Sequence, residues 1–197
     1  PIYISTATQL NSIGQTGSNW TLDKNYELVA DIYLSDVVFI PIGNGVESGF
    51  TGTFNGANHT IYNLTINSNA GIQYAGLFAK IGVSGIVKNV KVSDANISGA
   101  FDSVGVIAGI NNGTIILCDI NNATISNNTS NSYTGGLVGR NQYTITNVGS
   151  GNGVRANIAL CQVINLSLNT QSLYNGGLVG ENFASNLQNS CAVISGV

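Results

Sequence analysis

The sequence has few charged residues, which make up 8% of its 197 positions, against about 25% in typical soluble proteins. This shortage argues against coiled coils and long surface helices, because their outer faces are built from Glu, Lys and Arg. With 6 Lys and Arg residues and a formal net charge of −3, the chain lacks the basic surface that binds a nucleic-acid backbone. We therefore expect no nucleic-acid partner.

Other residue types and patterns are also scarce. The chain has 3 Cys, 1 His and no Met, so we expect neither a metal site nor a cofactor. No apolar run approaches the roughly 20 residues that span a bilayer, and we expect no membrane insertion by this segment. Disorder is disfavoured, because hydrophobic residues make up 43% of the chain and the net charge is small.

A repeated motif is the strongest pattern that the sequence does contain. Short Gly-rich apolar segments recur with steps of 30, 30 and 41 residues between their central positions. These central residues are Leu77, Ile107, Leu137 and Leu178. Equivalent residues at a regular period are typical of repeat proteins, in which each repeat packs on its neighbours. The longer step contains a Gly- and Asn-rich segment, and we expect it to form an inserted loop near residues 147–157.

The repeats predict β-strands that coil. Each repeat has two or three short stretches with alternating apolar residues, separated by turns rich in Gly, Asn and Ser. If each repeat is one turn of a coil, equivalent residues stack about 4.8 Å apart and the repeated apolar residues form a continuous core. The predicted fold is therefore all-β, a right-handed parallel β-helix (β-solenoid) of about five to six coils.

Two sets of side chains are expected to stack between coils. Asn111, Asn141 and Asn182 follow three of the repeated cores, which predicts a ladder of hydrogen-bonded amides. The three cysteines are expected to share one inward column as buried free thiols, and a disulfide between two of them is the alternative. They are Cys118, Cys161 and Cys191.

We interpret residues 1–197 as a single β-solenoid domain. Residues 1–49 are expected to form an N-terminal cap and the first coil, and residues 50–197 the repeat coils with the inserted loop. The stretch from Ser5 to Ile13 has the polar start and apolar spacing of a short capping helix, and Tyr26 to Leu34 alternates as a strand. Since the last repeat stops partway, we expect further domains of the same chain beyond Val197.

Two of the cores resemble a known family motif. The segments 135–141 and 176–182 look like the GLUG repeat, which is named for its Gly-Leu-x-Gly core, and residues 39–64 resemble the segment that often precedes such repeats. The cores around Leu77 and Ile107 depart from that motif. The resemblance implies a large secreted or surface-attached bacterial or archaeal protein, such as a haemagglutinin-like adhesin or a surface peptidase. In those peptidases the repeats lie outside the catalytic domain, so the resemblance carries over no catalytic residue.

Aromatic residues are the best candidates for binding, because they contribute a large contact area at low entropic cost. Tyr133 and Tyr174 occupy equivalent positions just before two cores, and Tyr143 begins the stretch that leads to the inserted loop. We predict that these tyrosines bind a glycan or protein on a host or neighbouring cell. Packing of the rings over the adjacent glycines is the alternative.

Catalysis is the main alternative function, because right-handed β-helices include polysaccharide lyases and glycosidases. Glycoside hydrolysis needs two carboxylates about 5 to 9.5 Å apart, and the closest approach to such a pair is Asp94 with Asp102. A third alternative, ice binding, requires regular Thr columns, and the outward columns here are mixed. We name no catalytic residue and expect the chain not to be an enzyme.

The predicted stacking explains the shortage of charge. An outward residue lies about 4.8 Å from its copy on the next coil, so a repeated charge would face its own sign. The remaining charges are expected to pair between coils, Lys91 with Asp119 and Arg140 with Glu181. Taken together, the sequence favours a secreted or cell-surface segment of an adhesin that mediates cell adhesion or serves as a rigid stalk.

Overall fold

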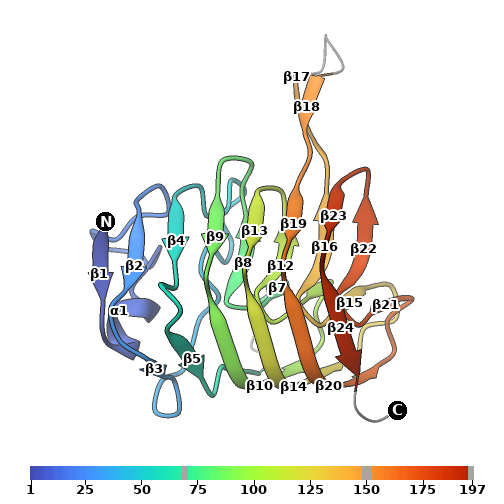
Figure 1. The fold of residues 1–197 in the computed structure, drawn as a ribbon, viewed down its shortest axis with the longest axis horizontal. Helices are drawn as coiled ribbons and strands as arrows, with labels where there is room; N and C mark the ends of the chain where they lie inside the picture. Colours follow the sequence, from blue (N-terminus) through green and yellow to red (C-terminus); the bar gives the residue numbers. More distant parts are fainter. Residues whose placement is uncertain (68–70, 148–151, 195–197) are drawn as a thin grey trace.

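The fold is a stack of short parallel β-strands with one short helix at its N-terminal end (Figure 1). A computed structural model describes residues 1–67, 71–147 and 152–194. Four sheets run along the stack, and in its repeated part each turn of the chain passes through all four before returning to the first. The architecture is all-β and solenoid-like, in agreement with the sequence.

The two longest sheets lie along the whole stack. The first sheet contains, in spatial order, β1 (Ile2–Ile4), β2 (Tyr26–Leu28), β4 (Thr53–Asn55), β9 (Ile86–Lys88), β13 (Thr114–Ile116), β19 (Asn157–Ala159) and β23 (Asn186–Gln188). The second sheet contains β3 (Ile32–Tyr33), β5 (Thr60–Tyr62), β10 (Lys91–Gly99), β14 (Asp119–Asn127), β20 (Gln162–Thr170) and β24 (Cys191–Ile194), and β6 (Thr65–Asn67) also pairs with β10. The first sheet is thus seven strands deep and the second six along its path, against the five to six coils expected.

The other two sheets have four strands each. The third sheet contains β7 (Tyr74–Ala75), β11 (Ser103–Val104), β15 (Tyr133–Gly135) and β21 (Tyr174–Gly176). The fourth contains β8 (Phe78–Ile81), β12 (Ala108–Asn111), β16 (Val138–Gln142) and β22 (Val179–Phe183). One coil therefore runs from β9 through β10, β11 and β12, and the next begins at β13.

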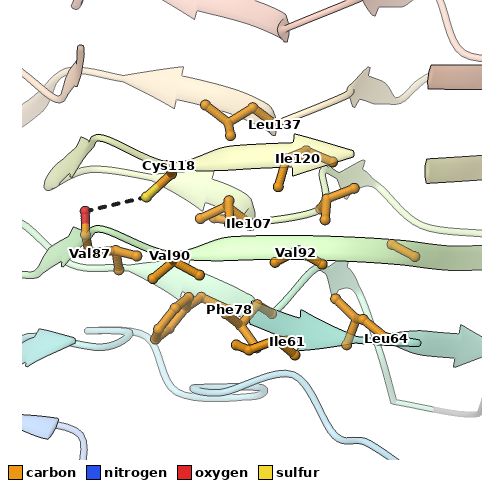
Figure 2. Packing of buried hydrophobic residues seen from close by; sticks show 14 of the residues in the cluster. Ile61, Leu64, Phe78, Val87, Val90, Val92, Ile107, Cys118, Ile120 and Leu137 are labelled. Carbon is orange, nitrogen blue, oxygen red and sulfur yellow. Dashed lines mark hydrogen bonds between the residues drawn. The ribbon is translucent and has the colours of Figure 1, made fainter. Parts of the chain in front are cut away.

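The core is the predicted column of repeated apolar residues. Phe78, Ala108, Val138 and Val179 are register partners, which places the preceding residues of the four cores in line. Leu77, Ile107 and Leu137 are fully buried, and Leu178 is 9% exposed. Figure 2 shows this packing, with residues from several coils pointing into one continuous interior. The repeat assignment is confirmed.

The corner between the first and second sheets requires an unusual backbone. In four successive coils the same position has a positive φ, between +46° and +55°. These residues are Asn89, Leu117, Leu160 and Asn189. Asn tolerates this left-handed region, whereas a branched apolar residue such as Leu is strained there.

The N-terminal cap contains α1 (Ala7–Asn11), close to the predicted position. The Thr6 hydroxyl accepts a hydrogen bond from the backbone N–H of Gln9, whose side chain bonds back to the Thr6 N–H, so the helix begins with a capping box. Leu10 is fully buried against the end of the core. No helix among the described residues is long and apolar enough to cross a membrane.

Three local expectations differ from the structure. The single strand expected over residues 26–34 is two strands, β2 and β3, because the chain turns a corner between them. The insertion contains an antiparallel hairpin, β17 (Thr144–Asn147) and β18 (Asn152–Val154), which projects from the stack (Figure 1). Residues 148–151 of the expected loop lie outside the described residues.

The third difference concerns the cysteine column. Cys118 and Cys161 are buried free thiols at equivalent positions, as expected. The placement of Cys191 in that column is wrong, because Cys191 pairs in register with Gln162 and is exposed. Ser190 takes the equivalent position instead, and its hydroxyl accepts a hydrogen bond from the Cys161 N–H at 3.1 Å.

Candidate binding sites

Tyr133 and Tyr174 stack on each other in the third sheet. They are register partners in β15 and β21, as the repeat predicted. Their ring centroids are 4.8 Å apart and the rings are inclined by 12°, since the spacing of parallel strands equals the spacing of stacked rings. Tyr174 is 47% exposed, so the pair presents an aromatic edge to solvent.

A charged pair from the neighbouring sheet completes this cluster. The guanidinium carbon of Arg140, in β16, lies 4.3 Å from the centroid of the Tyr133 ring. Arg140 Nε also donates to Glu181 Oε2 at 2.9 Å, which confirms one of the two expected ion pairs between coils. We call Tyr133, Tyr174, Arg140 and Glu181 the tyrosine–arginine cluster. Cation–π contact and the ion pair both restrict the arginine to one orientation.

A buried polar network holds the strands that carry the tyrosines. Asn127 is fully buried, and its Oδ1 accepts the backbone N–H of Phe101 at 3.0 Å. Its Nδ2 lies 3.2 Å from the hydroxyl oxygens of Ser132, Thr134 and Ser172, which come from two successive coils. Sequence reasoning missed this network. The pattern that could have revealed it is the recurrence of Ser or Thr close to both tyrosines.

Tyr143 lies at a different site, at the end of β16 where the hairpin begins. The guanidinium carbon of Arg155 is 5.8 Å from its ring centroid. Tyr143 lines a cavity of about 560 Å³ at the corner between the fourth and first sheets. The structure therefore brings two of the three candidate tyrosines together and places the third on a hollow that the sequence did not predict.

The carboxylates considered for catalysis have separate hydrogen-bond partners. Asp94 accepts from Asn122 Nδ2 and the Ser93 hydroxyl, and Asp102 accepts from Gln73 Nε2 at 2.6 Å. The extended strand from Asp94 to Gly99 alone spans on the order of 15 Å. The length of this strand exceeds the spacing between carboxylates that glycoside hydrolysis uses.

Among the other titratable groups of the described residues, one expected ion pair is absent, one His–Asp pair forms and the Cys118 thiol is buried. Lys91 and Asp119 are register partners, but they are not among the ion pairs of the described residues, so that expected pair is wrong. His59 Nδ1 lies 3.2 Å from Asp31 Oδ1. Burial raises the pKa of the Cys118 thiol well above its usual range, so it is a poor nucleophile or metal ligand. Among the described residues, no three His, Cys, Asp or Glu side chains gather as a metal site does.

The fold and these sites define a β-solenoid repeat protein with exposed polar and aromatic surfaces. No family model matches the chain. Halomucin from Haloquadratum walsbyi (strain DSM 16790 / HBSQ001) is 36% identical over 123 residues, which correspond to 58% of this chain and 1% of halomucin. The chain therefore spans a very small part of that relative.

A solved structure has a similar fold. The crystal structure of an immunoglobulin A1 protease-like protein from Bacteroides ovatus matches with a TM-score of 0.59. The match covers 99% of this chain and 66% of the other, at 18% sequence identity. At that identity the likeness shows the fold alone.

Proposed function

We propose that this chain is a secreted or cell-surface segment of an adhesin, and that it binds a glycan or protein on a host or neighbouring cell. The observation that carries the proposal is the tyrosine–arginine cluster. Its two tyrosine rings are stacked in register and partly exposed, and the Asn127 network cross-links the residues beside them in the chain. Rigid aromatic and arginine side chains of this kind dominate binding energy at interfaces, because little entropy is lost when they bind.

The cell-surface or extracellular location is supported by the similarity to halomucin over 58% of this chain. We also propose that the coils are right-handed and that the chain is related to GLUG-repeat surface proteins. Nearly all crossovers between parallel strands of one sheet are right-handed. The four Gly-rich cores stack in register, which supports their treatment as copies of one repeat.

The proposal assigns binding rather than catalysis to this segment, with further domains of the same chain as its neighbours. It is supported by the separate hydrogen-bond partners of the Asp94 and Asp102 carboxylates. A stack in which every coil pairs with the next also suits a stalk, because parallel pairing along its length resists bending. One segment can both bind a ligand and, as a stalk, hold other parts of the protein at a distance.

A cell-adhesion assay and a glycan array test the proposal. The double variant Tyr133→Ala/Tyr174→Ala is expected to reduce binding of the labelled protein at least tenfold. The matched control is Tyr33→Ala/Tyr62→Ala, because these tyrosines also stack, at 4.8 Å and 10°, but lie in β3 and β5 without an arginine contact among the described cation–π pairs. The proposal fails if the wild-type protein binds no glycan and no bacterial, archaeal or epithelial cells, or if both double variants lose binding equally.

A further inference from the structure

The cavity beside Tyr143 owes its shape to unequal turns in successive coils. Between β12 and β13 the chain turns with two residues, Asn112 and Gly113, whereas the preceding coil uses residues 82–85 and the following coil carries the β17–β18 hairpin. The short turn therefore lies at the bottom of the cavity, and residues of the two neighbouring coils, such as Val83 and Tyr143, line its sides. Glu47 and Ser48, from an excursion of the first coil, and Lys80 also line this hollow.

Asn112 carries an unsatisfied acceptor in the floor. Its side chain is 3% exposed, and its Nδ2 donates to the Gln142 carbonyl at 3.2 Å and to Thr144 Oγ1 at 2.7 Å. Because a carbonyl can only accept, the amide nitrogen must face Gln142, and this fixes the orientation of the group. Asn112 Oδ1 is buried and accepts no hydrogen bond from the described residues. Such an acceptor costs about 1 to 3 kcal/mol until a donor reaches it.

The Tyr143 ring on one side of the cavity packs closely against Gly153 of the hairpin. A Cβ atom built on Gly153 would lie 2.3 Å from Tyr143 Cζ and 2.4 Å from the carbonyl oxygen of Thr144. Only a residue without a side chain therefore allows the Tyr143 ring to lie against β18. This close approach sets the position of the ring over the cavity.

The lining is polar without an excess of either charge. Lys80 Nζ lies 3.4 Å from Glu47 Oε1, so the two charges nearest the cavity compensate each other. The remaining polar lining is neutral, and includes Ser48, Thr51 and Gln142. Ser48 and Thr51 also line a second cavity of about 340 Å³ next to Trp20. The two cavities thus adjoin, with one aromatic residue in each.

We propose that the Tyr143 cavity binds one or two units of a neutral saccharide. The apolar face of a sugar ring packs on Tyr143, and the neutral polar side chains Ser48, Thr51 and Gln142 bind its hydroxyls. A volume of about 560 Å³ is in the range of small-molecule sites. An anion is disfavoured, because Glu47 compensates the charge of Lys80 and the rest of the polar lining is neutral. The inference rests on the proposed binding of glycans and names their class at a second site.

Saturation-transfer NMR on the whole 197-residue protein tests this inference. The probes are cellobiose, lactose and N,N′-diacetylchitobiose, with digalacturonic acid as the acidic comparison. We expect saturation transfer to at least one neutral disaccharide, and at least tenfold weaker binding in Tyr143→Ala. Tyr143→Phe is expected to keep most of the affinity, and Gly153→Ala to lose it, because the added methyl group displaces the ring. Tyr33→Ala is the control that leaves this site intact, because Tyr33 is exposed and lies outside the cavity lining and the tyrosine–arginine cluster. Tyr133→Ala tests whether the disaccharide binds at that cluster instead.

Several results would overturn the inference. They are no transfer to any neutral disaccharide, stronger binding of digalacturonic acid, and unchanged binding in Tyr143→Ala. A fourth is binding lost equally in Tyr133→Ala. The variants separate this site from the tyrosine–arginine cluster, because Tyr143 lines the cavity and Tyr133 does not. A protein that adheres through Tyr133 and Tyr174 but binds no disaccharide disproves this inference alone, and the converse result disproves the proposed adhesion alone.

Discussion

At the scale of single residues, the corner between the first and second sheets shows where sequence and backbone disagree. Asn89 and Asn189 have side chains that suit a positive φ, but Leu117 and Leu160 occupy the same position with φ of +55° and +54°. Both leucines are also about half exposed, at 49% and 47%. They contribute little to the core and carry the cost of the left-handed backbone.

Leu117→Asn is therefore expected to stabilise the protein. Asn adopts the left-handed conformation at lower cost than Leu, and the gain in the free energy of unfolding should be about 0.5 to 1 kcal/mol. Urea denaturation measures it. Leu117→Ala is the control, because it removes the same exposed side chain without the local hydrogen bonding of Asn, and it should give a smaller gain. Equal or lower stability of Leu117→Asn relative to the wild type contradicts this account.

Tyr26 predicts a pH dependence. Its hydroxyl donates to the Thr21 carbonyl at 2.8 Å, and burial, with a smaller effect of Asp23, raises its pKa to about 12. Since the folded pKa lies above the usual value near 10, its contribution to stability is complete below pH 10 and is lost as the pH rises toward 12. One such group changes the free energy of unfolding by at most about 1.4 kcal/mol per pH unit.

The variant Tyr26→Phe separates this effect from those of the other tyrosines. At pH 8 it should be about 1 kcal/mol less stable, because the hydrogen bond to Thr21 is lost. Between pH 10 and 11.5 the difference should shrink, since only the wild-type side chain ionises on unfolding. Guanidinium denaturation at several pH values checks this, and a constant difference across the range would show that Tyr26 does not titrate as stated.

At the scale of elements, the sequence predicts what repeats and misses what is unique to one coil. The asparagine ladder was expected from its spacing, and the structure confirms it: Asn111 Nδ2 donates to Asn141 Oδ1 at 2.8 Å, and Asn141 Nδ2 to Asn182 Oδ1 at 2.7 Å. Among the described residues, the β17–β18 hairpin has no copy in other coils, so no column revealed its strands. Cys191 was misplaced by one residue, because in the last repeat a Ser comes where earlier repeats have Cys.

The asparagine ladder should be most sensitive at its middle. Asn141→Leu removes the acceptor for Asn111 and the donor for Asn182, and it should lower the free energy of unfolding by about 2 to 4 kcal/mol. Asn141 and Asn111 are fully buried, so water cannot replace the lost bonds. The control Asn182→Ala lies at the exposed end of the ladder and should cost less than about 1 kcal/mol. Equal costs by urea denaturation would disprove a continuous ladder.

At the scale of the whole molecule, each coil packs on its neighbours alone, and burial weakens toward the C-terminal end. Leu137 is fully buried and Leu178 is 9% exposed in the same column, while Phe183 and Leu187 are 57% and 41% exposed. The period predicted this stack, because stacking follows from local repetition. It could not predict the Tyr143 cavity, because its lining comes from residues spread between Glu47 and Thr144 and its shape depends on differences in turn length between coils.

A graded stability follows from this one-dimensional packing. Leu137→Ala, in a central coil, should lower the global free energy of unfolding by about 2 to 5 kcal/mol. Leu178→Ala removes the same atoms one coil further along, where fewer neighbours cover them. It should mainly accelerate amide hydrogen exchange in β21 to β24, leaving protection in β9 to β12 close to that of the wild type. Hydrogen exchange with mass spectrometry distinguishes the two variants. If Leu178→Ala reduces protection equally from β9 to β24, the stack unfolds as one cooperative unit and the gradient of burial has no counterpart in stability.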